Sequence, residues 1–268
     1  AAYWMISVMG WSVTGAGMSY VVCRAFGMAV VLTACLRSHR HFSVTLRGML
    51  RPSREMGKRI ARLGLPSTLE SASVQVCYLL ANSMAMGLGT LEAGVYQVSN
   101  TLSAFSTLPQ GIFSAIGVTF IGQALGENRP DKAVTCQKKL LRIALAVSLT
   151  MGLTLSLLGP ELVKLYTRDE YVRAQSAKVL WVWLLFDLPG VAINVNDPIL
   201  RTGGDTKMVM AYTAALVWGV RIPLTWLFCY VWTWGAAGVV LANVISVIIR
   251  AIVGQMRIRG GKWLSMKV

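Results

Sequence analysis

Two acidic side chains inside apolar sequence, Asp187 and Glu70, are the residues with the clearest capacity for chemistry. The stretch from Tyr171 to Lys207 is apolar and long enough, from Val179 onward, to cross a bilayer, yet Asp187 lies near its middle. An aspartate at membrane depth costs roughly 2.5–3.5 kcal/mol on insertion scales. A chain keeps such a residue where protein or water receives its charge, so the pattern predicts an ion site at Asp187.

Further polar and helix-breaking residues follow in the same stretch. Pro189 and Pro198 are predicted to interrupt the helix, and discontinuous helices often carry the ion sites of transporters. Asn194, Asn196 and Asp197 would add oxygen ligands beside Asp187.

Polar side chains also repeat at helical spacing in two earlier segments. In 63–87, the side chains from Ser67 through Gln75 to Asn82 fall within about 80° of one another on an ideal helix, with Glu70 about 60° to one side. In 93–125, a second polar face runs from Tyr96 to Ser114, bordered by Gln97. The residues predicted to bind the coupling cation or the substrate are Glu70, Gln75, Tyr78, Asn82, Tyr96, Gln97, Asn100, Asp187 and Asn194.

Two simpler interpretations of these polar residues stay open. Hydroxyl and amide groups also hold membrane helices together, at about 0.6 kcal/mol per contact. Arg221 is a second intramembrane charge, and it could neutralise Asp187 in a purely structural pair. Three helices with continuous polar faces nevertheless favour a hydrated cavity.

A buried carboxylate suits exchange chemistry. Burial disfavours the charged form, so the group can carry a proton between two aqueous sides, or hold Na⁺ with oxygen ligands such as Asn194 and Tyr78. A cationic substrate would compete with that ion for the same negative charge, which is the minimum physical basis of antiport.

The composition agrees with a membrane protein. The 268 residues have a mean hydropathy of +0.57, are 55% hydrophobic and are only 14% charged. Seven segments are predicted to be membrane helices, which makes the fold class an all-α polytopic bundle. These segments are about 15–36, 63–87, 93–125, 140–159, 176–200, 207–231 and 236–256, with a short amphipathic helix expected in 159–175.

The basic residues give the orientation. Twenty Lys and Arg residues fall on one side of the predicted spans and four on the other, so the positive-inside rule places the C-terminus in the cytoplasm, in a plasma (inner) membrane. The net charge of +15 therefore reflects topology, and nucleic acid is not an expected partner. No metalloprotease, nucleophile-elbow or Walker motif occurs, and the five scattered Cys form no C-x-x-C, so neither an enzyme nor a cofactor or metal site is predicted.

Two motifs resemble a known family. The run Leu108–Ile112 (LPQGI), followed by Gly122–Asn128 (GQALGEN), is similar to a pattern of the multidrug and toxic compound extrusion (MATE) transporters, and Leu200–Thr206 (LRTGGDT) resembles that family's LRGAGDT loop. Leu65, Pro66 and Glu70 resemble the opening of its seventh helix. Thr202 replaces the usual Gly, and both Glu70 and Asp187 lie about one turn from the family's commonest cation-site positions.

The resemblance implies one lobe of a two-lobe, pseudo-symmetric antiporter that exports amphipathic, often cationic compounds against H⁺ or Na⁺. The chain starts inside apolar sequence without an initiator Met, so we expect a fragment whose N-terminal lobe is missing. The expected partners are membrane lipid, an organic substrate and that lobe. The expected domains are 1–36 (last helix of the N-terminal lobe, 15–36), a basic cytoplasmic linker at 37–62, a six-helix lobe at 63–258 and a cytoplasmic tail at 259–268.

Three other functions fit parts of the sequence. A flippase for lipid-linked precursors or polysaccharides, from the same superfamily, would require a more cationic cavity. An intramembrane aspartyl protease could use Asp187 and Asp205, but the G-x-G-D pattern fails at Thr202. A truncated lobe could also act as a membrane scaffold without transporting.

Overall fold

Long helices form nearly all of the described chain. The structure is a computed structural model that describes residues 12–37 and 54–261. It divides into two compact units, Ala1–Ala61 and Arg62–Val268. The predicted linker therefore lies partly, at 38–53, and the predicted tail partly, at 262–268, outside the described residues.

Seven long helical segments occur where seven membrane helices are predicted. They are α2 (Ser12–Arg37), α4 (Arg54–Met86), α5 (Thr90–Gly126), α6 (Pro130–Lys164), α7 (Glu170–Thr202), the composite segment α8 (Thr206–Leu216), η1 (Val217–Arg221), α9 (Ile222–Trp226) and η2 (Leu227–Val231), and α10 (Gly235–Arg259). The prediction of an all-α membrane bundle is confirmed, and no strand occurs among the described residues.

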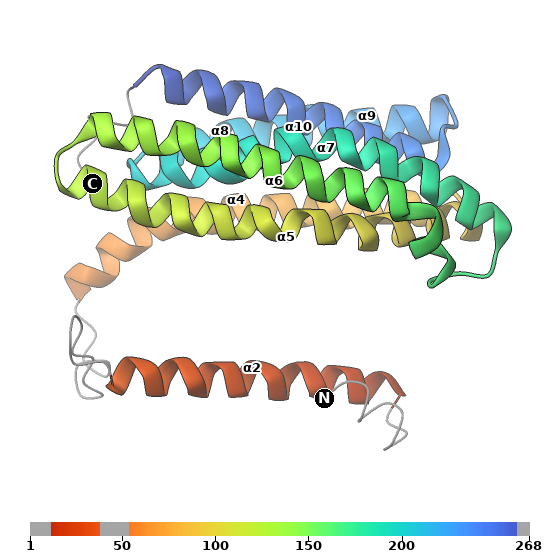
Figure 1. Cartoon of the computed structure of the whole chain (residues 1–268), viewed down its shortest axis with the longest axis horizontal. Coiled ribbons are helices and arrows are strands. Elements are labelled where there is room, and N and C mark those ends of the chain that lie inside the picture. Colours follow the sequence, from red (N-terminus) through yellow and green to blue (C-terminus); the bar gives the residue numbers. More distant parts are fainter. Residues whose placement is uncertain (1–11, 38–53, 262–268) are drawn as a thin grey trace. The chain divides into compact units, whose positions relative to one another are not determined.

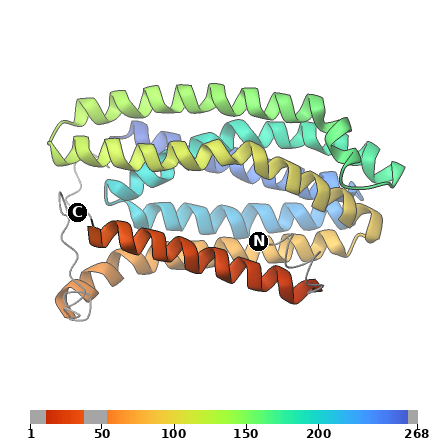
Figure 2. The ribbon, with the colours of Figure 1, turned by 60° about the horizontal axis from the view of Figure 1, so that its bottom comes forward.

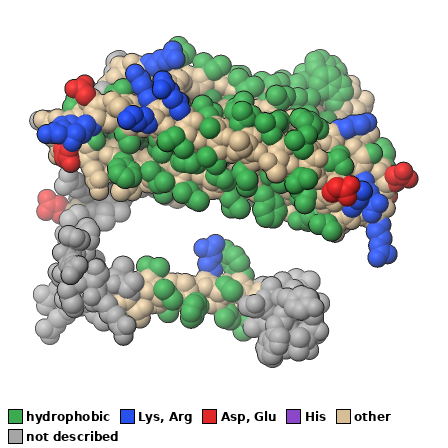
Figure 3. Space-filling model, in the orientation of Figure 1, with side chains coloured by type: hydrophobic (Ala, Val, Ile, Leu, Met, Phe, Trp, Pro, Cys, Tyr) green, Lys and Arg blue, Asp and Glu red, His purple; other side chains and the backbone are tan. Residues whose placement is uncertain are grey.

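Five of these described segments are long and apolar enough to cross a membrane: α5, α6, α7, Thr206–Val231 and α10. In α2 the apolar stretch is only Gly17–Thr33, and α4 carries Glu70 and several polar residues, which lower its hydropathy. Hydrophobic side chains cover the middle of the Arg62–Val268 unit on the face seen in Figure 3, while charged side chains gather at its two ends. This distribution matches a bundle that lies in hydrocarbon.

Helix α7 is the centre of the second unit. It packs extensively against α5, α6 and α10, and the helices run lengthwise beside one another (Figures 1 and 2). We call the end with the turns 127–129 and 203–205 the basic end, and the end with the turns 87–89, 165–169 and 232–234 the opposite end. Asp187 lies about halfway between these ends.

Two local expectations are wrong. Pro189 and Pro198 do not interrupt α7, which is continuous from Glu170 to Thr202. No separate amphipathic helix forms in 159–175, because α6 continues through Pro160 to Lys164 and α7 already starts at Glu170. A helix in a bundle tolerates an internal proline because neighbouring helices and local adjustments satisfy the freed carbonyl groups.

The segment Thr206–Val231 contains two π-helical turns, η1 and η2, separated by the short helix α9. Such turns are rare and frequently occur at functional sites. The first of them ends at Arg221.

Candidate functional site

Asp187 lies in a polar centre where α5, α6 and α7 meet. Its side chain is only 2% exposed, and its Oδ1 accepts a hydrogen bond of 2.8 Å from Ser106 on α5. On the α6 side the carboxylate lies against Gly152, where a Cβ atom would be 2.5 Å from Oδ2. Among the described residues no basic side chain pairs with Asp187, so its charge has no protein counter-ion there.

Buried amides continue this centre toward the basic end. Asn194 donates hydrogen bonds to Gln110 Oε1 at 2.9 Å and to the Gly190 carbonyl at 3.0 Å. The Nε2 atom of Gln110 and the hydroxyl of Ser148 on α6 are buried without a partner among the described residues. Buried polar atoms of this kind are normally satisfied by water or by a bound ion.

Glu70 lies in a different cluster, made of ion pairs. Its Oε1 accepts from Arg201 at 2.7 Å and from Arg250 at 3.2 Å. Arg250 also donates to Asp197, at 2.7 Å, and Asp197 accepts from the hydroxyl of Tyr212. We call these five residues from α4, α7, α8 and α10 the ion-pair cluster. Its two carboxylates and two guanidinium groups balance in charge.

The structure does not bring the two predicted acidic residues together. Asp197, in the ion-pair cluster, is ten residues beyond Asp187 on the same helix, which is about 15 Å along the axis. Glu70 already has two cationic partners, whereas Asp187 has none among the described residues. Asp187 is therefore the carboxylate better placed to receive an added cation.

Arg221 does not pair with Asp187, so that structural alternative is wrong. Its guanidinium carbon lies 4.0 Å from the ring centroid of Tyr78, over the ring face. In the first unit, Arg24 contacts Tyr20 through a hydrogen bond of 2.9 Å and through the ring face.

The other six predicted site residues differ in burial. Tyr96 is buried, Tyr78, Asn82 and Asn100 are half-buried, and Gln75 and Gln97 are exposed. Within the described chain, none of these six side chains forms a hydrogen bond. They share a polar character and stay available for a ligand or another part of the protein.

Sequence reasoning missed Ser106, Arg201 and Arg250 as site residues. Ser106 belongs to a buried row, Ser99, Ser103, Ser106 and Gln110, whose spacing of four, three and four could have revealed it. Arg201 and Arg250 were used only to assign the orientation in the membrane, because the sequence does not show that a basic residue has a buried acidic partner.

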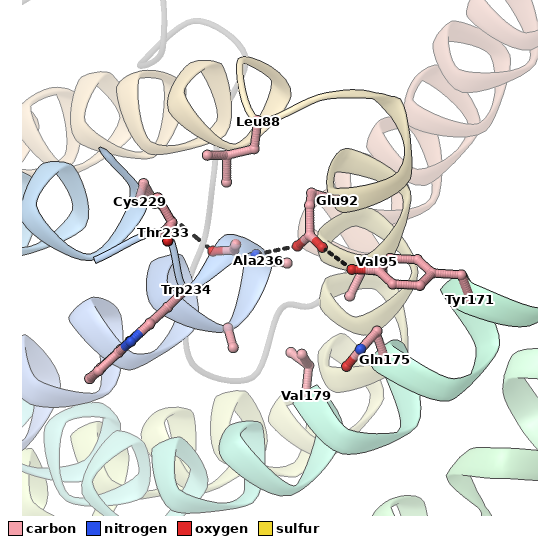
Figure 4. A pocket seen from close by; sticks show the side chains of 12 residues that line it. Leu88, Glu92, Val95, Tyr171, Gln175, Val179, Cys229, Thr233, Trp234 and Ala236 are labelled. Atoms are coloured by element: carbon pink, nitrogen blue, oxygen red, sulfur yellow. Dashed lines mark hydrogen bonds between the residues drawn. The ribbon is translucent and has the colours of Figure 1, made fainter. Parts of the chain in front are cut away.

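At the opposite end, a cavity of about 410 Å³ lies between the 87–89 turn, the start of α7 and the start of α10. Figure 4 shows Glu92 between two donors on its wall: its carboxylate accepts from the Tyr171 hydroxyl and from the Ala236 N–H, each at 2.6 Å. Leu88, Val95 and Val179 supply apolar walls. Glu92 thus ties the starts of α5, α7 and α10 together. No group of three or more metal-ligating side chains occurs in the described part of the chain.

The long apolar helices of this bundle define the chain as a polytopic membrane protein. The family model MatE matches residues 66–227. The chain belongs to this family of transporters, which confirms the resemblance drawn from its motifs.

Several relatives are similar over almost the whole chain. The uncharacterized transporter YisQ of Bacillus subtilis is 23% identical over 257 residues, covering 94% of this chain and 55% of that protein. A protein named "Probable multidrug resistance protein NorM" from Pasteurella multocida is 22% identical, covering 96% and 57%. The chain thus spans little more than half the length of these relatives.

Solved structures share the fold. A transporter of the MOP superfamily from Pyrococcus furiosus, described as having a binding pocket of reverse polarity, matches with a TM-score of 0.82 at 23% identity, covering 98% of this chain and 60% of that one. An outward-facing MATE transporter matches with a TM-score of 0.81 at 23% identity, covering 96% and 59%. These likenesses establish the fold.

Proposed function

We propose that this chain forms part of a secondary active antiporter that exports amphipathic organic compounds, cationic drugs or metabolites among them, in exchange for H⁺ or Na⁺. The observation that carries the proposal is Asp187, a carboxylate 2% exposed in a membrane helix with Ser106 as its described polar partner. Such a group needs a cation to offset its charge. The relatives named as multidrug resistance proteins support an exporter.

The ion acts at Asp187 through direct competition. A proton or Na⁺ bound to Asp187 neutralises the polar centre. Release of that ion restores the negative charge, which attracts a cationic substrate. The buried Ser148 hydroxyl and the Gln110 amide offer further polar contacts to an ion or to the water that accompanies it. Because each cation excludes the other, an inward ion gradient drives outward movement of the substrate.

Glu70 has a second role in this proposal. It holds α4 to α7 and α10 through Arg201 and Arg250, so it couples changes at the basic end to the helix that carries Asp187. A cation could replace an arginine there only after the ion-pair cluster opens.

We also propose the orientation and the partners. The basic end would face the cytoplasm of the plasma (inner) membrane, as the positive-inside rule requires. An N-terminal lobe would complete the substrate path, and lipid would surround the apolar belt.

The test is transport by the full-length protein in proteoliposomes with an imposed H⁺ or Na⁺ gradient. Asp187→Asn should reduce gradient-driven export at least about tenfold, and Glu70→Gln should reduce it less. Glu161→Gln, an exposed acidic residue paired with Lys164, is the matched control and should leave export unchanged. Unchanged gradient dependence in Asp187→Asn would defeat the proposal, and translocation of a lipid-linked precursor without drug export would favour the flippase.

A further inference from the structure

Arg221 is a buried cation that has no counter-ion among the described residues of the Arg62–Val268 unit. It ends the π-helical turn η1 inside the Thr206–Val231 span, and it is 4% exposed. Its Nε atom is buried with no hydrogen-bond partner among the described residues. Its guanidinium forms no ion pair with an acidic residue of this unit.

The buried acidic residues of the unit are all engaged elsewhere. Glu70 and Asp197 pair with Arg201 and Arg250 in the ion-pair cluster, and Asp205 pairs with Arg257 near the basic end. Asp187 accepts its hydrogen bond from Ser106, in the centre between α5, α6 and α7. Among the described residues of this unit, the buried charge of Arg221 therefore has no acidic partner.

The neighbours of Arg221 are aromatic and neutral. Tyr78 of α4 lies against one face of the guanidinium group, with the guanidinium carbon 4.0 Å from the ring centroid. Cys77 lies at the same level, with its thiol 3.8 Å from the Val217 carbonyl of η1. The hydroxyl of Tyr78 forms no hydrogen bond within the described chain, so it can donate to a ligand.

These neighbours compensate the charge only in part. A cation–π contact recovers only part of the free energy that is lost when a charged group is taken out of water. The Tyr78 ring covers a face of the guanidinium plane, and no described residue accepts a hydrogen bond from the guanidinium N–H groups. The N–H edge of a guanidinium group matches the two oxygens of a carboxylate or phosphate group.

We propose that Arg221, with Tyr78, binds the acidic group, a carboxylate or a phosphate, of an amphipathic organic molecule. The inference rests on the proposed export function, because it adds molecules with an acidic group to the compounds that the protein would export. Binding itself requires no ion gradient.

Three ligands with one ring system test the site. Naphthalene-2-carboxylate, its neutral amide naphthalene-2-carboxamide and 2-naphthylmethylammonium are titrated calorimetrically into the full-length protein in maltoside micelles. Wild-type protein should bind the carboxylate at least about tenfold more tightly than the amide, and Arg221→Met should abolish that preference. Lys178→Met removes an exposed basic residue of α7 and should preserve it.

Thermal unfolding without ligand separates a ligand site from a structural pair. Removing an unpaired buried charge should leave the unfolding temperature of Arg221→Met equal to or above that of wild type. A lower unfolding temperature together with an intact carboxylate preference would overturn the proposal, because Arg221 would then pair with an acidic residue elsewhere in the protein. If Arg221→Met does not fold, Arg221→Lys and Tyr78→Leu are measured instead, and a full carboxylate preference in both would also overturn it.

Two further experiments identify the source of the acidic group and distinguish the Arg221 site from the proposed export function. Competition by short-chain phosphatidylglycerol, but not by zwitterionic phosphatidylcholine, would identify an anionic lipid headgroup as the natural ligand, and its absence would favour a soluble organic anion. Asp187→Asn should lose gradient-driven export while it keeps the carboxylate preference. Export that persists in Asp187→Asn therefore counts against the proposed function, and a missing carboxylate preference in the wild-type protein counts against the Arg221 site.

Discussion

Arg250 and Asp197 are joined by two hydrogen bonds to a single carboxylate oxygen, from Nε at 3.1 Å and from Nη2 at 2.7 Å. The same guanidinium reaches Glu70 at 3.2 Å, so Arg250 lies between two carboxylates from different helices. This one side chain links α10 to both α7 and α4.

Replacing Arg250 should destabilise the bundle strongly. In Arg250→Met, Glu70 keeps Arg201 and Asp197 keeps Tyr212, so the loss should lie near the lower limit for breaking a buried pair, about 3 kcal/mol. Lys164→Met breaks an exposed pair with Glu161 and should cost under about 1 kcal/mol. Chemical unfolding in detergent measures both. The double variant with Asp197→Asn should lose less than the sum of the single changes, and simple additivity would show that the two residues do not interact.

Gly152→Ala should disturb the Asp187 centre. The added methyl group would lie 2.5 Å from Asp187 Oδ2 and 2.7 Å from Leu184 Cδ1, so one of these side chains must move, at a cost of about 1–3 kcal/mol. Gly111→Ala on α5 is the control, because no atom lies within 4 Å of its added Cβ. Export assays should show an altered ion dependence for Gly152→Ala alone. Equal behaviour of the two variants would contradict the close approach of Asp187 to α6.

Glu92→Gln should loosen the opposite end of the bundle. The amide keeps one acceptor oxygen for two donors, Tyr171 and Ala236, and hydrogen bonds to a charged group contribute about 1.5–3 kcal/mol. Amide hydrogen exchange at Ala236 should quicken at least about fivefold. Tyr171→Phe removes one of the two bonds and should leave that exchange nearly unchanged, so a faster exchange only in Tyr171→Phe would refute the role of Glu92.

Asn196 connects three helices through amide groups. It accepts from Gln137 of α6 at 2.9 Å and donates to Gln255 of α10 at 2.7 Å. At roughly 0.6 kcal/mol per bond within a membrane, Asn196→Leu should cost about 1.2 kcal/mol. Gln97 is exposed on α5, and its side chain forms no hydrogen bond within the described chain. Gln97→Leu should therefore leave the free energy of unfolding nearly unchanged in the same experiment.

The helices were predictable because hydrophobic length alone specifies a membrane span. All seven predicted segments contain a long helix, although each helix extends beyond the apolar stretch because its polar ends continue past hydrocarbon. The continuity of α7 through Pro189 and Pro198 was not predictable, since it depends on the neighbours that surround α7.

The sequence predicted which residues belong to the candidate site, but not which residues they contact. Helical spacing placed Asp187 and Glu70 inside the bundle, where both are buried. It could not show that Asp187 turns toward Ser106 and Gly152 while Glu70 turns toward two arginines, because a helical pattern gives a direction around one axis and not the identity of the facing helix. For the same reason, the sequence could not show that Arg221 has no acidic partner, since this depends on the contacts of four other acidic side chains.

The two π-helical turns of the Thr206–Val231 segment have a consequence for chain length. Each π turn accommodates roughly one residue more than the α-helix that it interrupts, so this segment carries surplus residues within a fixed span. Deleting Gly219, which is exposed in η1, would convert the turn to ordinary α-helix and preserve the downstream packing of Phe228 and Cys229. The same deletion within α7 would rotate every later side chain by about 100°. This segment is therefore the transmembrane element in which single-residue insertions and deletions can accumulate during evolution.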